Sequence, residues 1–114
     1  MTPEDLIDVF REEASARNIE KYKAFLNQEP GLDEGWNLFR KIVLNLDNNE
    51  QKLMFSFVKL VQNDSIASVL SILDNQTYPV NQIEDFLLFH GNDQMNGDLC
   101  DIFWEKEEES WRNS

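Results

Sequence analysis

The chain has 114 residues, a net charge of −12 at pH 7 and a single cysteine. Leu, Ile, Val and Phe account for 34 of the residues, which is too apolar a composition for intrinsic disorder and sufficient for one core. The acidic charge argues against binding to nucleic acid or to anionic membrane surfaces, and one cysteine excludes an intramolecular disulfide.

The cellular location can be predicted from the same features. The first ten residues, MTPEDLIDVF, carry acids where a signal peptide needs basic residues. No apolar run approaches the roughly 18 residues of a membrane span. A lone cysteine also suits a reducing compartment. We therefore expect a protein of the cytoplasm with no membrane partner.

The first predicted helix covers residues 3–28. Thr2 can cap this helix, and Pro3 suits its first position. Asn18 could cap a second segment, so the region forms either one helix or two. The run Glu29-Pro30-Gly31 ends it.

Two further helices are predicted before residue 74. The first begins near Asp33 and aligns four apolar residues on one face: Trp36, Phe39, Val43 and Leu46. The second runs from about residue 49 to 73 and is apolar over a wide arc, so we expect it at the centre of the fold. Its polar residue Asp64 either lies within one long helix or caps a second one. The absence of Gly and Pro in this stretch favours one helix.

The region after residue 73 contains the only strand-like stretches, 78–80 and 84–89. We predict that the second stretch pairs with Gln94-Met95 across the turn Gly91-Asn92-Asp93, which gives a small β-hairpin near residues 84–96. Residues 98–111 then form the last helix, with its core face made by Leu99, Ile102 and Phe103. The predicted fold is mainly α: a single compact domain, residues 1–114, with four to six helices and this hairpin.

The stretch HGNDQMNGDLCDIFWE, residues 90–105, looks at first like a calcium-binding loop. Placing Gly97 at the sixth position of such a loop puts Phe103 at the twelfth, where calcium needs a bidentate carboxylate. The stretch therefore lacks the carboxylate that contributes most to calcium affinity in such a loop. We instead predict a turn at Asn96-Gly97 and a helix start at Asp98, as cap or first-turn acid.

Three carboxylates of the last helix, Asp98, Asp101 and Glu105, share one face. Carboxylates act as general acid and base only when one has a raised pKa, usually through burial. This face is turned by about 100° from the predicted core face, so we expect it to be solvated. His90 is the only histidine, and an acidic setting raises the thiol pKa of Cys100, which disfavours a nucleophile–base pair. We predict no catalytic, metal or cofactor site, and the rival hypothesis is an enzyme or metal protein that uses these carboxylates with His90.

One stripe of the last helix suits a partner surface. Cys100, Trp104 and Trp111 lie at positions i, i+4 and i+11, and acids surround them. Tryptophan ringed by charged residues is a common hot-spot arrangement. The predicted partner-binding residues are Cys100, Asp101, Trp104, Glu105, Glu108 and Trp111. The alternative is that Trp104 packs on the hairpin and Trp111 covers the core edge.

Three segments near the C-terminus form a pattern: SILDN at residues 71–75, FLL at 86–88 and MNGDLCDIF at 95–103. This pattern resembles small uncharacterised bacterial helical proteins with an ILDG-type helix end, a short strand and an LNGDLxDxF helix start. The chain departs from it with Asn75 in place of Gly and Met95 in place of Leu. The resemblance implies a bacterial cytoplasmic origin and a helix–strand–helix order, and it implies no activity.

The charge distribution leads to the functional hypothesis. Residues 1–59 hold 11 acids and 8 bases, whereas residues 60–114 hold 11 acids and 2 bases. Such a field attracts a basic protein and speeds its association. We therefore predict a non-enzymatic domain that binds and neutralises or regulates a basic protein, as an immunity protein does with a toxin. A homodimeric structural protein that pairs through Trp104 and Trp111 is the alternative.

Overall fold

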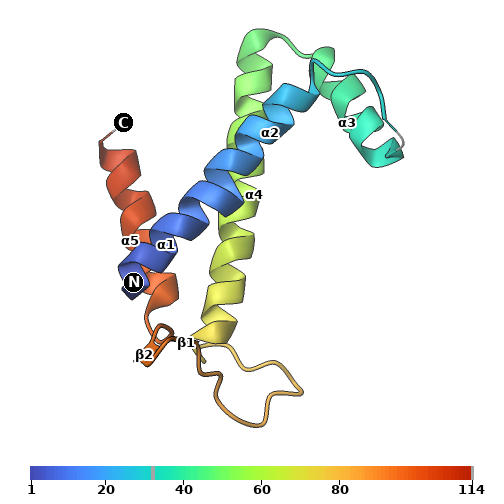
Figure 1. Ribbon diagram of the computed structural model, residues 1–114. Helices are drawn as coiled ribbons and strands as arrows, with labels where there is room; N and C mark the ends of the chain where they lie inside the picture. Colours follow the sequence, from blue (N-terminus) through green and yellow to red (C-terminus); the bar gives the residue numbers. More distant parts are fainter. Residues whose placement is uncertain (32, 114) are drawn as a thin grey trace.

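The computed structural model describes residues 1–31 and 33–113 (Figure 1). Within these ranges the elements are α1 (Pro3–Arg11), the π-helical turn η1 (Glu12–Ala16), α2 (Arg17–Phe25), α3 (Glu34–Leu44), α4 (Asn48–Leu73), β1 (Phe89–His90), β2 (Asp93–Gln94) and α5 (Leu99–Arg112). Since α1, η1 and α2 join end to end, they form one rod, and the described chain has four helical rods. The predicted mainly α domain with a small hairpin is confirmed.

The first rod is a single helix with a π turn in its middle. Thr2 and Asp5 form a capping box at its start, in which each side chain accepts a hydrogen bond from the backbone N–H of the other. Asn18 does not cap a second helix. Its side chain donates to the carbonyl of Ala14 one turn back, at 3.1 Å, within the rod. The region therefore forms one helix, and η1 is the place where its register changes.

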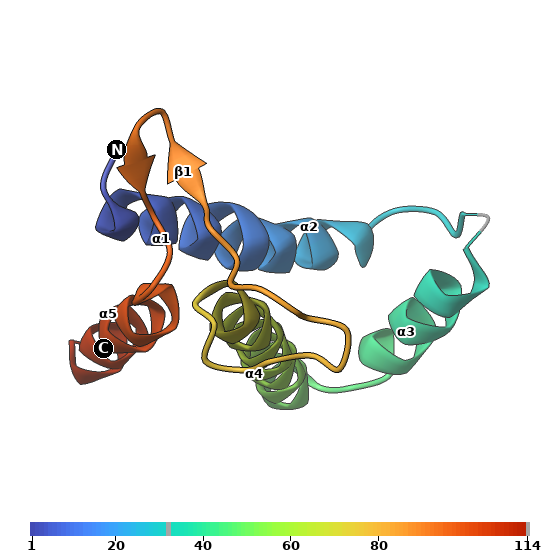
Figure 2. The same cartoon turned by 90° about the horizontal axis from the view of Figure 1, so that it is seen from below.

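The central helix is α4, a 26-residue helix of about 39 Å. A capping box between Asp47 and Glu50 begins it. Asp64 is exposed inside this helix, so the prediction of one continuous helix is confirmed and Asp64 caps nothing there. The other rods all contact α4 along its length, and Figure 2 shows it nearly end-on between them.

Two apolar cores lie at different heights along α4. The larger core joins α1, α4 and α5 and consists of Ile7, Ala67, Leu70, Leu99, Cys100 and Phe103. The smaller core joins α2, α3 and α4 through Leu26, Val43 and Phe55. Trp36 supports the smaller core because its ring lies within 6 Å of three others, those of Tyr22, Phe25 and Phe39. The fold is therefore built as two packed ends on one shared helix.

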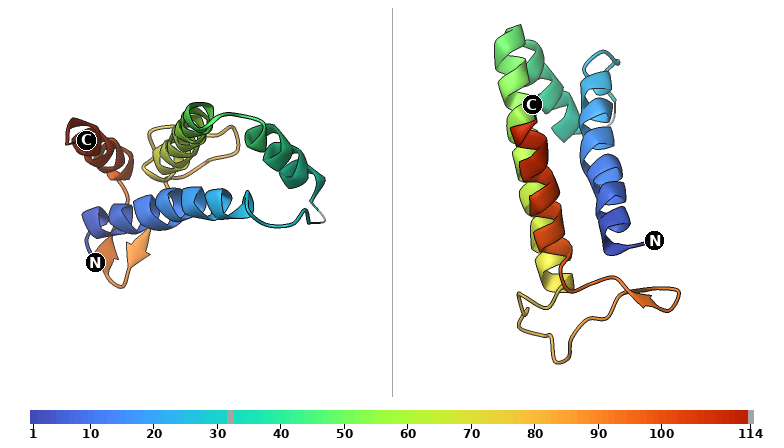
Figure 3. Two further views of the ribbon diagram at one scale, coloured as in Figure 1. Left: turned by 90° about the horizontal axis from the view of Figure 1, so that it is seen from above. Right: turned by 90° about the vertical axis from the view of Figure 1, so that its left-hand side faces the viewer.

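The rods spread outward from α4. In Figures 1 and 3, α3 lies on one side of α4, α5 on the other, and the loop after α4 extends beyond its end. The radius of gyration is 17.3 Å, whereas a tightly packed domain of this length has about 13 Å. The accessible surface is 8159 Å², whereas a packed monomer of this mass exposes about 6,500 Å². The chain thus leaves more surface uncovered than its length requires.

The hairpin is shorter than predicted. Phe89 pairs with Gln94 and His90 with Asp93, so the turn contains only Gly91 and Asn92. Gly91 has a φ of +62°, as tight hairpin turns require. The prediction that Asp93 lies in the turn is wrong, and residues 78–80 and 84–88 are irregular backbone instead of strand. Among the described helices, none combines the length and the apolar character needed to cross a bilayer.

Candidate functional site

Cys100 was predicted on the partner surface of α5, but the structure places it in the larger core. It is 9% exposed, and its thiol donates to the carbonyl of Ala67 at 3.5 Å. Burial raises the pKa of the Cys100 thiol, and the charges of Asp101 and Asp74 raise it further. Helical spacing alone placed Cys100 beside Trp104, but the larger core extends around α5 far enough to cover the cysteine. Cys100 is therefore a core residue in this fold.

The other predicted residues of α5 divide into packed and exposed groups. Trp104 is half-buried against the larger core, with its ring centroid 5.3 Å from that of Phe103. Trp111 is exposed and lies 6.4 Å from Trp104, measured between ring centroids. The predicted acids of this surface are all exposed: Asp101, Glu105 and Glu108. The acidic strip of α5 therefore exists, with Trp111 at its C-terminal end.

The residues of the rival chemical hypothesis are also exposed. Asp98, Asp101 and Glu105 face solvent on α5, and His90 lies on the exposed hairpin. Over residues 1–31 and 33–113, no three His, Cys, Asp or Glu side chains gather in a way that could hold a metal ion.

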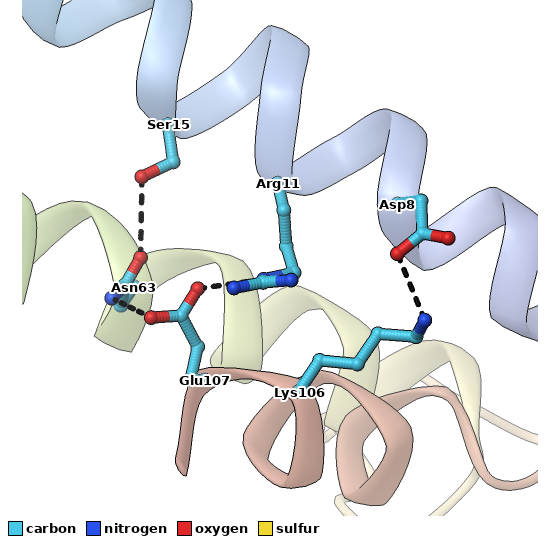
Figure 4. A network of polar contacts seen from close by, with 6 residues as sticks. All are labelled: Asp8, Arg11, Ser15, Asn63, Lys106 and Glu107. Atoms are coloured by element: carbon cyan, nitrogen blue, oxygen red, sulfur yellow. Dashed lines mark hydrogen bonds and ion pairs between the residues drawn. The ribbon is translucent and has the colours of Figure 1, made fainter. Parts of the chain in front are cut away.

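Glu107 is a buried residue that the sequence patterns did not reveal. It is 2% exposed, and Figure 4 shows its carboxylate between the side chains of Arg11 and Asn63. Arg11 Nε donates to its Oε1 at 2.9 Å, and Asn63 Nδ2 donates to its Oε2 at 3.2 Å. Ser15 of η1 donates to Asn63 Oδ1 at 3.4 Å. Both oxygens of Glu107 are thus used to hold three helices together, and this polar layer is structural.

Asp74 performs the capping role that was predicted for Asp98. The Asp74 side chain is buried at the end of α4, where it accepts a hydrogen bond from the Gly97 N–H at 2.6 Å and another from the Cys100 N–H at 2.8 Å. Asp98 occupies the N-cap position of α5 but makes no capping hydrogen bond. The beginning of α5 is therefore fixed to the end of α4.

Two asparagines hold the loop between α4 and β1. Asn75, with a φ of +62°, donates to the Phe86 carbonyl at 3.0 Å and accepts from the Phe86 N–H at 2.7 Å. Asn96 is buried, accepts from the Leu88 N–H at 2.9 Å, and donates to the Phe86 and Leu73 carbonyls. We call residues 76–88 the pinned loop, because its far end is bonded back to the end of α4.

The pinned loop exposes apolar side chains on this fixed backbone. Val80 is fully exposed, Ile83 is 93% exposed, and Leu87 is also exposed. Acids lie among them, at Glu84 and Asp85, and the whole stretch of residues 60–105 contains eight acids and no Lys or Arg. Apolar anchors surrounded by one sign of charge are typical of a protein-binding surface. The pinned loop is therefore the candidate functional site.

The sequence offered two signals for this loop. Asn is the residue other than Gly that ends helices in the left-handed conformation, as Asn75 does here. Pro79 cannot donate to a strand ladder, which argued against a strand at 78–80. The apolar run of residues 86–89 concealed both signals because it resembles a buried strand.

Comparison with known proteins adds no relative: no family model, no curated protein and no solved structure matches this chain.

Proposed function

We propose that the protein is a non-enzymatic binding domain that uses the pinned loop, together with the acidic strip of α5, to bind a basic protein. The single observation that carries the proposal is the exposure of Val80, Ile83 and Leu87 on a loop whose far end, at Phe86 and Leu88, is fixed by Asn75 and Asn96. An apolar side chain in this setting has no packing role in the described fold. It gains free energy only when a partner covers it.

The pinning hydrogen bonds favour binding through entropy. Fixing the backbone of one residue costs about 1–2 kcal/mol in lost conformational entropy. In this loop that cost belongs to folding, since Phe86 and Leu88 are already bonded to the two asparagines. A preordered loop binds more tightly than a flexible one with the same contacts.

The charge around the loop defines the chemistry of the partner. With eight acids and no Lys or Arg over residues 60–105, a basic rim around an apolar pocket is the complementary surface. Salt should weaken the complex, because the Debye length is about 8 Å at physiological ionic strength. An immunity protein that neutralises a basic toxin in a bacterial cytoplasm is one concrete form of this function.

The test is a pull-down with the tagged full chain from native lysate, at low and at high salt, read by mass spectrometry. We expect one basic protein that is retained at low salt and depleted at high salt. The double substitution Val80→Ser/Ile83→Ser should abolish its capture, because it removes two of the proposed anchors. The fold should stay intact, because these exposed side chains contribute nothing to the core. The matched control is Val9→Ala, which removes an exposed apolar side chain from α1. Equal capture by both variants, or no capture at either salt, would overturn the proposal.

A further inference from the structure

The outward face of α4 is apolar and uncovered in its N-terminal half. Leu53 and Phe57 are 71% and 60% exposed, and Leu60 and Val61 are close to half exposed. These four residues stand at i, i+4, i+7 and i+8, so they share one side of the helix. We call them the α4 face. The spacing is that of a helix-packing surface, yet the side chains stay about half exposed or more.

The neighbouring helix α3 adds to this exposed surface. Leu38 and Ile42 are exposed one turn apart on α3, whereas Val43 of the same helix is buried against Phe55 of α4. Since α3 packs beside the N-terminal half of α4, its exposed residues lie at the same end of the molecule as the α4 face (Figure 1). Two helices thus leave apolar surface open at this end.

The uncovered area matches what a stable dimer needs. The chain exposes 8159 Å², which exceeds the roughly 6,500 Å² of a packed monomer by about 1,700 Å². Obligate homodimers bury about 2,000–5,000 Å² in total, or roughly 1,000–2,500 Å² for each subunit. The excess lies within this range. The chain therefore exposes as much additional surface as one subunit of an obligate homodimer buries in its interface.

The charge at this end favours a second copy as the occupant. Residues 34–63 contain three acids and four Lys or Arg, a net charge of +1. The remaining residues carry −13, which gives the chain its net charge of −12. Two acidic chains repel each other through every other region. The α4 face lies in the part where that repulsion is absent, while a basic partner is drawn to the opposite, acidic end.

We propose that two copies of the chain pair through the α4 face, with the two α4 helices antiparallel about a two-fold axis near Phe57. Residue 73 is 16 positions along the helix from Phe57, or about 24 Å. An antiparallel pair therefore holds the two pinned loops about 48 Å apart, far beyond the Debye length of about 8 Å. A parallel pair would bring the two acidic ends together. The repulsion therefore selects the antiparallel arrangement.

The test is the mass of the purified full chain in solution, by light scattering and by sedimentation, with no partner present. We expect twice the 13.4 kDa of one chain. The double substitution Phe57→Glu/Leu60→Glu should give the single-chain mass with unchanged helical circular dichroism. Val80→Glu, which places the same charge on the pinned loop, is the matched control and should remain dimeric. This measurement is independent of the basic partner, so each proposal can fail alone.

A second pair of variants tests the antiparallel arrangement and does not place two added charges of the same sign on the α4 face. Leu53→Lys should weaken the dimer by about tenfold or more, because two desolvation penalties replace apolar contacts. In an antiparallel pair residue 53 faces residue 61 of the other copy, so Leu53→Lys/Val61→Glu should recover most of the loss. Absence of recovery would exclude the antiparallel arrangement. A single-chain mass for the wild type, or a dimer unaffected by all of these changes, would overturn the proposal.

Discussion

The loop end and the α3 end of the molecule both expose apolar side chains, but they hold them in different ways. The α4 face is a regular helical stripe in a region of net charge +1, whereas the pinned loop is irregular backbone in a stretch without Lys or Arg. A regular stripe is complementary to another helix, and isolated anchors on a fixed loop are complementary to pockets. Exposure alone therefore does not define a partner; backbone geometry and charge do.

The polar layer around Glu107 joins the first rod, α4 and α5, and breaking it should have the largest effect on stability. Glu107→Ala leaves Arg11 and Asn63 without their shared acceptor, so we expect the free energy of unfolding to fall by about 3 kcal/mol. Urea denaturation gives this value. Glu105→Ala, at an exposed acid on the same helix, should change it by less than about 0.5 kcal/mol. Equal effects of the two substitutions would show that the polar layer does not stabilise the fold.

The second prediction compares two aspartates that compete for one capping role. Asp74→Ala removes the hydrogen bonds from the Gly97 N–H, just before α5, and from the Cys100 N–H in its first turn, and should lower the free energy of unfolding by about 2 kcal/mol. Asp98→Ala should change it by less than about 0.5 kcal/mol, because its side chain makes no capping bond. Thermal or urea unfolding of both variants measures the difference. The reverse order of effects would return the cap to Asp98.

The third prediction separates the shape of the loop from its hydrogen bonds. Asn75→Gly keeps the positive φ but removes the side chain that holds Phe86, so stability should change by no more than about 1 kcal/mol. We expect faster amide exchange over residues 76–88 and weaker binding of the basic partner, by about tenfold. The mass of the dimer should not change. Unchanged exchange in this loop would mean that Asn96 alone holds it.

The smallest predicted effect concerns pH. Burial raises the pKa of Cys100 in the folded chain, whereas an unfolded thiol titrates near about 8.5. Above that pH the unfolded state releases a proton that the folded state keeps, so this residue lowers stability as the pH rises. The midpoint temperature of thermal unfolding should therefore fall less steeply between pH 7 and pH 9.5 for Cys100→Ala than for the wild type. Parallel pH profiles would contradict it.

The sequence predicted the helices well because their signals are local. Thr2 and Asp47 cap helices from adjacent positions, and the apolar period of α4 is visible in its own residues. Burial of Glu107 could not be predicted in this way, since it depends on Arg11, which is 96 positions away. The core position of Cys100 was missed for the same reason, because it depends on where α5 crosses α4.

The candidate site was only partly predictable. The acidity of the C-terminal half was visible in the composition, but two of the apolar anchors, Val80 and Leu87, were assigned to the strand-like stretches 78–80 and 84–89, and Ile83 was left between them. Their true conformation depends on hydrogen bonds from the side chains of Asn75 and Asn96, and such bonds leave no periodic pattern. Asparagine side chains that take the place of a neighbouring strand can be recognised only once the fold has brought the two ends of the pinned loop together.

The stretch without Lys or Arg also has a consequence for handling the protein. Trypsin cleaves after Lys and Arg, so it passes from Lys59 to Lys106 without a cut, and the pinned loop and hairpin leave the digestion on one long peptide. Reagents that couple to lysine amines likewise attach only outside this stretch. A chain immobilised through its lysines therefore presents the pinned loop without chemical modification.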